Sequence, residues 1–292
     1  MKILLFSRPH TTPPTDEVRR IFDAARAHGF EVAVNREFAP EAERITGLRF
    51  AERQLFGERI GAQPEGTFMI CYGGDGTLLE GARRLHGAAI PVAGINSGRL
   101  GFLTTTPPDG IGQLFDDLAA GHVRTEERTL LEASGGFAEA PDTPLALNEF
   151  AIQRHGAGMI SVETYVDRQM VATYHGDGVL VSTPTGSTAY SLSAGGPVVS
   201  PRCACLILSP LAPHNLTMRP VVIPDTSEIT LRIRARQAGA SVTLDNRIYA
   251  AADGAEFTVR RSERRFFLAV PHNITFYDTL RNKMMWGIDI RS

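Results

Sequence analysis

Five consecutive residues, Gly73-Gly74-Asp75-Gly76-Thr77, have types and a spacing that suit phosphate chemistry. The apolar run Phe68–Tyr72 before them predicts a buried strand, and the pattern Thr77–Leu85 after them predicts a helix. A glycine turn between a strand and a helix points backbone N–H groups at an anion, and the missing Cβ atoms let the anion approach closely. We therefore predict a phosphate loop formed by Gly73, Gly74, Gly76 and Thr77.

Asp75 is the unusual member of this turn, because a carboxylate repels phosphate. Its presence makes sense if it accepts the proton of an attacking hydroxyl, or if it helps to hold Mg²⁺ beside the phosphates. The alternative is structural, since Asp is a favoured N-cap residue of helices. The five residues alone leave both interpretations open.

A second candidate site lies later in the chain, where Gly178–Val181 leads into the small and hydroxylated stretch Ser182–Tyr190. Small residues let donors approach a ligand, and the Tyr190 ring offers a flat face to a base. Upstream, Asn148 has the groups to pair with an adenine edge, and Glu149 can accept hydrogen bonds from ribose hydroxyls. The alternatives are a polar surface loop for the stretch and a plain turn for Asn148 and Glu149.

Alternating strands and helices must position Asp75. We predict strands at 2–7, 31–35, 68–72 and 90–95, and helices starting after a Thr15 cap, around 42–56, at 77–87 and within 107–121. Such alternation predicts a parallel sheet that binds ligands at the carboxyl ends of its strands, where Asp75 lies.

After Val123 the hydrophobic pattern changes to period two, as in Ile160–Asp167, Ile229–Arg234 and Val242–Leu244. We therefore predict an α/β nucleotide-binding domain over 1–122, a β-rich domain over 123–269 and a tail over 270–292 that returns to the first domain. The tail contains a possible short helix at 278–286. The arginine cluster 260–265 is expected to form a solvated turn.

The composition indicates a soluble globular protein of 292 residues, with 43% hydrophobic residues and a net charge of −2. The charge gives no sign of a nucleic-acid footprint, and no apolar run has the length of a membrane span. The three cysteines lack the spacing of zinc or redox sites and are expected to be reduced core residues. We predict a cytoplasmic protein without nucleic-acid or membrane partners.

In order and spacing, these motifs resemble the NAD kinase family over nearly the whole chain. The resemblance rests on Gly73–Thr77, Leu147–Glu149, Asp177-Gly178 with Ser182–Tyr190, Pro213-His214, Arg219-Pro220 and the tail Leu280–Gly287. The glycine turn alone is also found in diacylglycerol and sphingosine kinases. The long motif Pro184–Tyr190 makes the resemblance specific.

The resemblance implies a Rossmann-like α/β domain followed by a β-sandwich domain, with ATP-dependent phosphorylation of the adenosine ribose 2′-hydroxyl of NAD. It implies that ATP and NAD are the substrates, that nucleotide phosphates carry Mg²⁺ or another divalent ion, and that the chain forms a homodimer or homotetramer. Asp75 would accept the 2′-hydroxyl proton beside Gly76. The other NAD-binding positions would be Phe102, Asn148, Glu149, His175, Asp177, Thr188, Ala189, Tyr190 and Ser193.

The chain departs from the family pattern at two places. It has Asp245-Asn246-Arg247 where members often have Asp-Gly-Gln, and it has His175 where many carry a basic residue.

Two other functions are compatible with the glycine turn at 73–77: a lipid kinase and a non-enzymatic NAD-sensing module. The first needs an apolar acyl-chain site and the second a DNA-binding element, and the sequence indicates neither.

Overall fold

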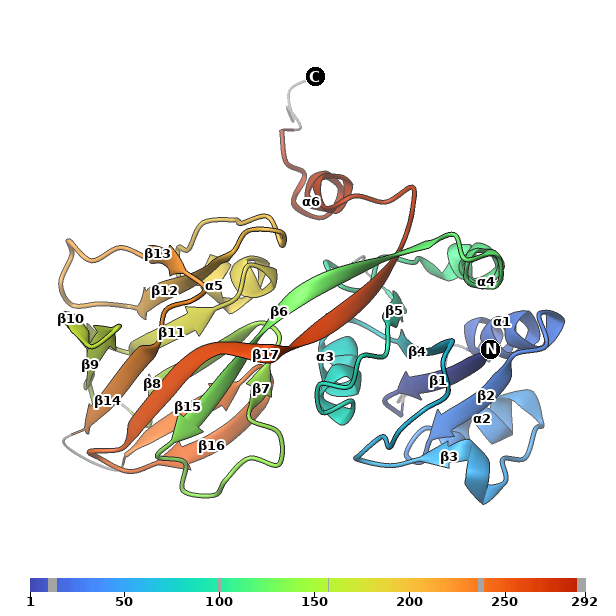
Figure 1. The fold of residues 1–292 in the computed structure, drawn as a ribbon, viewed down its shortest axis with the longest axis horizontal. Coiled ribbons are helices and arrows are strands. Elements are labelled where there is room, and N and C mark those ends of the chain that lie inside the picture. The colour runs from blue at the N-terminus through green and yellow to red at the C-terminus, as the bar shows by residue number, and fades with distance from the viewer. Residues whose placement is uncertain (10–14, 99–100, 157, 236–238, 288–292) are drawn as a thin grey trace. The chain divides into compact units, whose positions relative to one another are not determined.

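A computed structural model describes residues 1–9, 15–98, 101–156, 158–235 and 239–287. The chain groups into two compact units (Figure 1). Unit 1 consists of residues 1–127 and 266–292, and unit 2 consists of residues 128–265. Two long strands, β6 (Val123–Gly135) and β17 (Glu256–Pro271), carry the chain from one unit into the other.

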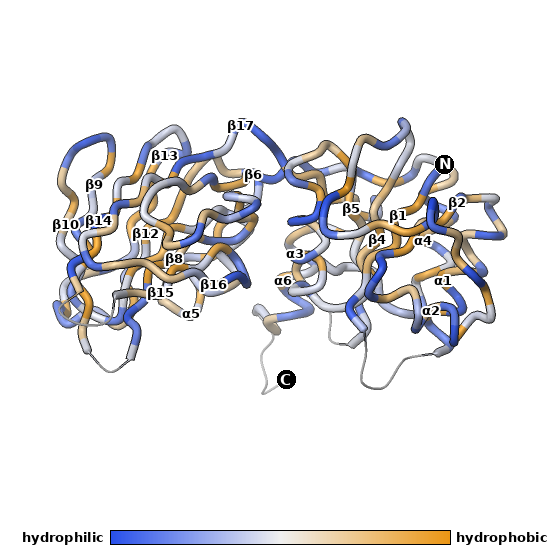
Figure 2. Tube along the Cα trace, turned by 90° about the horizontal axis from the view of Figure 1, so that it is seen from below, coloured by the Kyte–Doolittle hydropathy of each residue, from blue (hydrophilic) through white to orange (hydrophobic). Residues whose placement is uncertain are grey.

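Unit 1 is built on a parallel sheet, as the alternation of strands and helices predicts. Its strand order is β5 (Val92–Ile95), β4 (Thr67–Tyr72), β1 (Lys2–Ser7), β2 (Glu31–Asn35) and β3 (Leu55–Phe56). The end of β17 joins this sheet beside β5, where Leu268 pairs with Val92. Because β1, β4 and β5 are buried on both faces, they read as continuous apolar runs, which Figure 2 shows in orange.

The helices of unit 1 are α1 (Thr15–Ala27), α2 (Ala39–Thr46), α3 (Asp75–Arg84), α4 (Ile111–Ala120) and α6 (Phe276–Met284). Helix α1 includes Thr15, which the sequence predicts as its cap. The bounds predicted for a helix around 42–56 were wrong. Helix α2 starts earlier and ends before Gly47, whose left-handed φ of 73° closes the last turn. A short 3₁₀ turn, Glu52–Gln54, and β3 follow it.

Unit 2 is a sandwich of two antiparallel sheets, which confirms the predicted fold class. One sheet contains β10 (Gln169–Gly176), β9 (Ile160–Val166), β14 (Ile229–Ala235) and β17, with β6 and β7 (Leu145–Ala146) beside them. The other has the order β13 (Val221–Pro224), β12 (Cys205–Leu211), β11 (Gly178–Ser182), β8 (Glu149–Arg154), β15 (Ala240–Leu244) and β16 (Arg247–Ala251). Phe150, Val181, Leu231 and Phe257 pack between the two sheets in one core.

The arginine cluster 260–265 is not a turn, because β17 runs through it without interruption. Neighbouring carboxylates make this possible: Arg261 lies 2.7 Å from Asp225, and Arg260 lies 3.8 Å from Glu132. A charged strand of this kind depends on partners distant in sequence, so a local pattern cannot reveal it.

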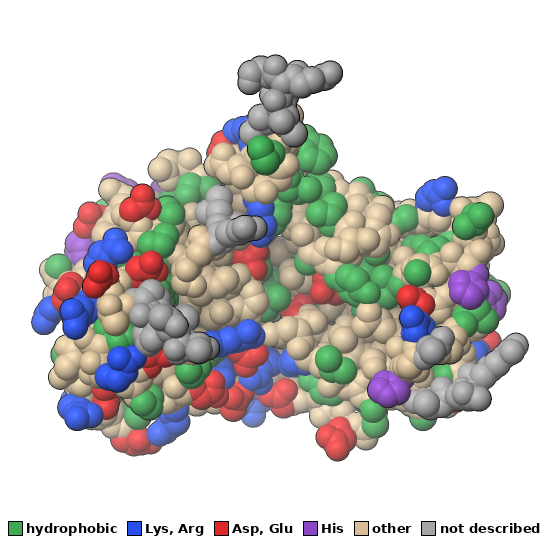
Figure 3. Space-filling model, turned by 180° about the vertical axis from the view of Figure 1, so that it is seen from behind, with side chains coloured by type: hydrophobic (Ala, Val, Ile, Leu, Met, Phe, Trp, Pro, Cys, Tyr) green, Lys and Arg blue, Asp and Glu red, His purple; other side chains and the backbone are tan. Residues whose placement is uncertain are grey.

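The cysteines are free, as expected, but only one belongs to the core. Cys71 is buried, and burial raises the pKa of its thiol, whereas Cys203 is exposed and Cys205 half-buried. Acidic and basic side chains are mixed over the face drawn in Figure 3. Within the described part of the chain, no helix has the length and apolarity needed to cross a membrane.

Candidate active site

The glycine turn after β4 has an open outer surface. Gly73 has a φ of 148°, and a Cβ on it would lie 2.5 Å from the Thr77 hydroxyl oxygen. Thr77 is buried beneath the turn, whereas a Cβ on Gly74 or Gly76 would meet nothing within 4 Å. The turn therefore presents bare backbone at the first turn of α3, where helix N–H groups have no intrahelical acceptor.

Asp75 is not an N-cap. Gly74 occupies the cap position, α3 begins at Asp75, and no side-chain cap hydrogen bond forms. The carboxylate instead accepts hydrogen bonds from the next loop of the unit. Its Oδ2 accepts from the Phe102 N–H at 2.8 Å, and its Oδ1 accepts from the Leu103 N–H at 3.1 Å, the Thr104 N–H at 3.0 Å and the Thr104 hydroxyl at 2.9 Å.

The loop that binds Asp75 is itself held in place. The buried Asn96 amide donates to the Thr104 hydroxyl oxygen at 3.0 Å. A Cβ on Gly101 would lie 1.9 Å from Asp75 Oδ1, so a residue with a side chain could not follow this path. The sequence did not single out Asn96, Gly101 or Thr104 for the site. Asn96-Ser97-Gly98 after an apolar strand was the available signal.

The C-terminal helix α6 adds a cation to this cluster. Lys283 Nζ lies 3.8 Å from Asp75 Oδ2 and 5.0 Å from the centre of the Phe102 ring. The rings of Phe102 and Phe276 have centroids 6.4 Å apart, which joins the loop to the start of α6. The side chain of Asp75 is 27% exposed and that of Lys283 is 37% exposed, so solvent or a ligand can reach both.

In unit 2, Asp245 positions the Asn148-Glu149 segment. Its carboxylate accepts hydrogen bonds from the N–H groups of Leu147, Asn148 and Glu149 at 2.9, 2.7 and 3.2 Å. Burial raises the pKa of Asp245, and the three N–H donors oppose this shift. Sequence reasoning noted Asp245 as part of an altered motif but assigned it no function.

Arg247 supports the same segment from the adjoining strand. Its guanidinium donates to the carbonyl oxygens of Thr143 at 2.6 Å and Leu145 at 2.5 Å. The residue that replaces a family glutamine is therefore bound to the backbone that precedes Asn148.

Asn148 and Glu149 carry buried polar atoms without partners. Both residues are 7% exposed, and neither Asn148 Oδ1 nor Glu149 Oε2 has a hydrogen-bond partner within the described residues. Burial raises the pKa of Glu149 to about 8, and the nearby Asp245 charge adds to the shift. Leaving a buried polar group without a partner costs about 1–3 kcal/mol. These two atoms are thus suited to hydrogen-bond a ligand.

A cavity of about 370 Å³ lies beside Tyr190. The Gln153 amide donates to the Tyr190 hydroxyl oxygen at 2.6 Å, and Arg154 Nε lies 2.5 Å from Asp177 Oδ1. Tyr190 is 37% exposed. The residues that line this cavity are Gln153, Arg154, Asp177, Tyr190, Ser241, Thr243 and Ile248. The cavity therefore brings together Tyr190 and Asp177, which are both predicted NAD contacts, with Gln153 and Arg154, which are not.

Most hydroxyls of the small-residue stretch face the protein. Thr183 donates from its hydroxyl to the Leu147 carbonyl at 2.6 Å, and Ser182 donates to the Asn148 carbonyl at 3.2 Å. A Cβ on Gly186 would lie 2.2 Å from the Asn148 carbonyl oxygen. The stretch therefore positions Asn148, and our expectation that these hydroxyls approach a ligand was wrong for the buried residues.

The remaining predicted residues of unit 2 lie outside the cavity lining. Thr188 and Ala189 are half-buried before the single-turn helix α5 (Tyr190–Ser193), whose last residue is Ser193. His175 is exposed on β10, with its Nδ1 2.7 Å from the Ser161 hydroxyl.

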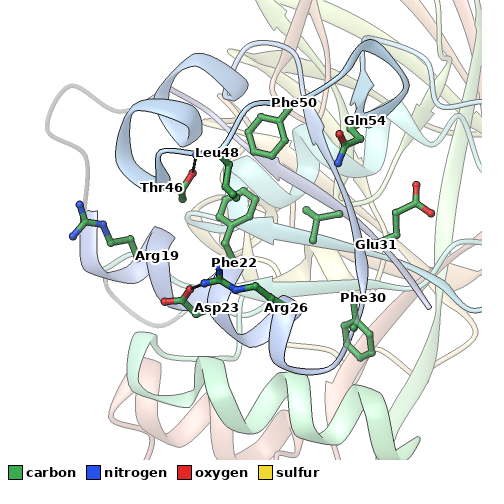
Figure 4. A pocket seen from close by; sticks show the side chains of 12 residues that line it. Arg19, Phe22, Asp23, Arg26, Phe30, Glu31, Thr46, Leu48, Phe50 and Gln54 are labelled. Carbon is green, nitrogen blue, oxygen red and sulfur yellow. Dashed lines mark hydrogen bonds and ion pairs between the residues drawn. The ribbon is translucent and has the colours of Figure 1, made fainter.

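A second cavity, of about 510 Å³, lies in unit 1 (Figure 4). It is lined by apolar side chains such as Phe22, Leu48 and Phe50, with charged residues such as Arg19 and Arg26 around them. Arg19 donates to the Ile45 carbonyl at 3.0 Å, and Arg26 is paired with Asp23. No residue predicted for the site lines this cavity, so we do not assign it to the active site.

Comparison with known families gives matches over both halves of the chain. Residues 15–123 match the ATP-NAD kinase N-terminal domain, and residues 147–270 match the ATP-NAD kinase C-terminal domain. An NAD kinase from Bacteroides fragilis is 36% identical over 292 residues, covering all of both chains. An NAD kinase from Cytophaga hutchinsonii is 41% identical over 77% of each chain.

Two solved structures have the same fold. An NAD kinase from Archaeoglobus fulgidus in complex with ATP is 29% identical, with a TM-score of 0.75 over 98% of this chain and 99% of that one. A yeast NADH kinase complexed with NADH gives a TM-score of 0.84 over 100% of this chain and 89% of that one. At 21% identity, the second likeness shows the fold alone.

Proposed function

The chain belongs to the NAD kinase family, which phosphorylates NAD with ATP, and from this premise we propose how its residues carry out the transfer. We propose that the γ-phosphoryl group of ATP moves to the 2′-hydroxyl of the adenosine ribose, with Asp75 as proton acceptor. The observation that carries the proposal is a carboxylate fixed beside an open glycine turn. The family assignment also sets aside the lipid kinase and the non-enzymatic sensor.

The hydrogen bonds around Asp75 distinguish its two oxygens. Oδ1 already accepts three hydrogen bonds, whereas Oδ2 accepts one, from the Phe102 N–H. A carboxylate oxygen has two lone pairs, so Oδ2 retains capacity for one more donor. We infer that Oδ2 accepts the 2′-hydroxyl proton. Phosphoryl transfer depends chiefly on alignment and charge stabilisation, and a fixed carboxylate aligns the nucleophile.

We assign the adenosine to the residues with unsatisfied polar atoms in unit 2. Asn148 Oδ1 would accept from the adenine amino group, and Glu149 Oε2 would bind a ribose hydroxyl. The exposed ring of Tyr190 would stack on the base. Asp177, Thr188, Ala189, Ser193, His175 and Phe102 are retained as proposed NAD contacts, and Gly73, Gly74, Gly76 and Thr77 as the proposed phosphate loop.

The family implies a divalent ion, and few side chains of the described residues could bind it. No group of three or more His, Cys, Asp or Glu side chains suited to a metal occurs within the described ranges. Four hydrogen bonds from N–H and O–H donors already reach the Asp75 carboxylate, so it could offer an ion one free position at most, on Oδ2. These residues are therefore consistent with an ion that is held mainly by the nucleotide phosphates, where it would offset the charge of the transferred group.

We also propose a cytoplasmic location.

The proposal is tested by Asp75→Asn with Thr104→Val as the matched control. Asp75→Asn should lower kcat by about 10²–10⁴-fold, the range of general-base contributions, with a much smaller change in the Kd for NAD. Thr104→Val removes one hydrogen bond to Asp75 and one from Asn96, but it keeps the carboxylate and its three backbone donors, so its kcat should fall less than about tenfold.

The measurements are kcat and Kd for NAD, with product identification to locate the phosphate, and the melting temperature. The amide nitrogen that Asp75→Asn introduces would face N–H donors, so some loss of stability is expected and must be measured separately. An Asp75→Asn protein that folds, binds NAD and turns over at more than about a tenth of the wild-type rate would remove Asp75 from the mechanism.

A further inference from the structure

Lys283 is the cation that the fold brings to Asp75. Its Nζ lies 3.8 Å from Asp75 Oδ2, the oxygen with remaining lone-pair capacity, and 5.0 Å from the centre of the Phe102 ring. At 3.8 Å the ammonium is near the carboxylate without a hydrogen bond to it, whereas a tight charge-assisted pair would have a separation of about 2.7–2.9 Å. Its N–H donors are therefore available for another anion.

The choice of lysine at this position is exceptional within the chain. Among 30 basic residues, only Lys2 and Lys283 are lysines, and the other 28 are arginines. An arginine beside Asp75 would favour a bidentate pair that occupies both carboxylate oxygens. An ammonium is a compact charge with three rotatable donors, so it can balance the carboxylate and leave Oδ2 free.

We propose that Lys283 is a catalytic residue that contacts the phosphoryl group during its transfer, an inference that rests on the proposed role of Asp75. A 2′-hydroxyl hydrogen-bonded to Oδ2 lies about 2.7 Å from it, and the attacked phosphorus lies about 3–3.5 Å further on. The flexible Lys283 side chain, 3.8 Å from the same Oδ2, reaches the phosphoryl oxygens across this distance. Its charge offsets the repulsion between the carboxylate and the phosphoryl group.

The step is balanced without any change at the ammonium. The bond between the 2′-oxygen and phosphorus forms while the bond between phosphorus and the ADP oxygen breaks, and ADP leaves with the electron pair. The hydroxyl proton passes to Asp75, and Lys283 stays protonated throughout.

The test replaces Lys283 by Met, Arg and Ala, with Lys2→Met as the matched control. Lys2 stands at the start of β1, and Asp75 follows the carboxyl end of the neighbouring strand β4. Lys283→Met should lower kcat by about 10²-fold, the scale of losing one electrostatic stabiliser, while the KM for NAD changes less than about threefold. Lys283→Arg should recover part of the loss, and Lys2→Met should leave kcat unchanged.

Chemical rescue separates catalysis from structure. Ethylammonium should restore activity to Lys283→Ala, whereas tetramethylammonium, which has no N–H donor, should not. Rescue that is equal with both ions, or absent with both, would overturn the proposal. A Lys283→Met protein that keeps a near wild-type kcat would also overturn it. If Lys283→Met does not fold, Lys283→Arg and the rescue of Lys283→Ala decide.

The same assay distinguishes failure of this inference from failure of the proposed function. A wild-type protein that does not phosphorylate NAD with ATP contradicts the function itself. A wild type that is active, with Asp75→Asn inactive and Lys283→Met still active, leaves the proposed role of Asp75 intact and rejects only Lys283.

Discussion

At the scale of single residues, the two carboxylates proposed to bind NAD, one in each unit, have different surroundings. Asp75 is partly exposed and accepts four hydrogen bonds, which fix the position of its carboxylate. Glu149 is buried, has an oxygen without a partner among the described residues, and lies near a second acid, Asp245. The first carboxylate is therefore fixed to orient a hydroxyl, and the second is suited to hydrogen-bond a ribose.

The raised pKa of Glu149 predicts a pH-dependent stability. Its pKa is about 8 in the folded protein against an ordinary 4.5, so the folded state binds more protons between these values. The free energy of unfolding should therefore fall as pH rises from about 4.5 to about 8. Asp245, whose pKa burial also raises, contributes in the same direction.

The measurement is the melting temperature of wild type and Glu149→Gln at about pH 4.5 and about pH 8, the two ends of this interval. The amide cannot ionise, so the variant should lose less stability than wild type across this interval. Parallel losses in the two proteins would show that Glu149 does not carry the effect.

At the scale of elements, α3 is anchored firmly at the end opposite Asp75. Arg84 is 2% exposed, lies 4.8 Å from the centre of the Phe6 ring, and pairs with Glu37 and Glu58 at 3.1 Å. A Cβ on Gly81 would lie 2.5 Å from Cys71 Sγ, so the helix packs directly against β4. The strand and the helix on either side of the glycine turn thus hold a fixed relation to each other.

The β15–β16 hairpin has the corresponding structural role in unit 2, because Asp245 lies in the turn between these strands. We expect Asp245→Asn to destabilise the protein by about 1–3 kcal/mol, since the amide would face three N–H groups in a half-buried place. It should also raise the KM for NAD, because Asn148 and Glu149 lose their support.

Asp253→Asn is the matched control for this prediction. Asp253 also accepts a backbone N–H, from Ala235 at 2.8 Å, but it is exposed. Asp245→Asn should have the lower melting temperature and the higher KM for NAD of the two variants. Equal effects of the two substitutions would contradict a special role for Asp245.

At the scale of the whole molecule, we propose a homodimer or homotetramer. Strand β13 pairs with β12 along one edge, and its Val221 and Val222 are exposed, as is Leu216 just before it. Unpaired strand edges with apolar side chains are surfaces that an oligomer can cover. Light scattering at micromolar concentration should give two or four times the chain mass of 31.7 kDa. A mass of a single chain at that concentration would contradict the prediction.

The sequence by itself determined the features that depend on neighbouring residues. The apolar runs, the glycine turn at 73–77 and the period-two strands are local patterns, and they predicted the parallel sheet, a β-rich second domain and the position of Asp75. Gly47 shows the limit of this reading, since a left-handed glycine ended a helix that the polar stretch around 42–56 did not delimit.

Only the tertiary structure decided which groups meet. Asp75 receives its hydrogen bonds from loop residues that lie 27 to 29 positions later in the chain. Lys283 comes from the far end of the chain, and Asp245 lies 96 residues beyond Glu149. The hydroxyls of Ser182 and Thr183 turn inward to the backbone of Leu147 and Asn148. Such partners are chosen by long-range packing of strands and loops, because hydrogen-bonding groups removed from water bind whichever complementary group the fold places beside them.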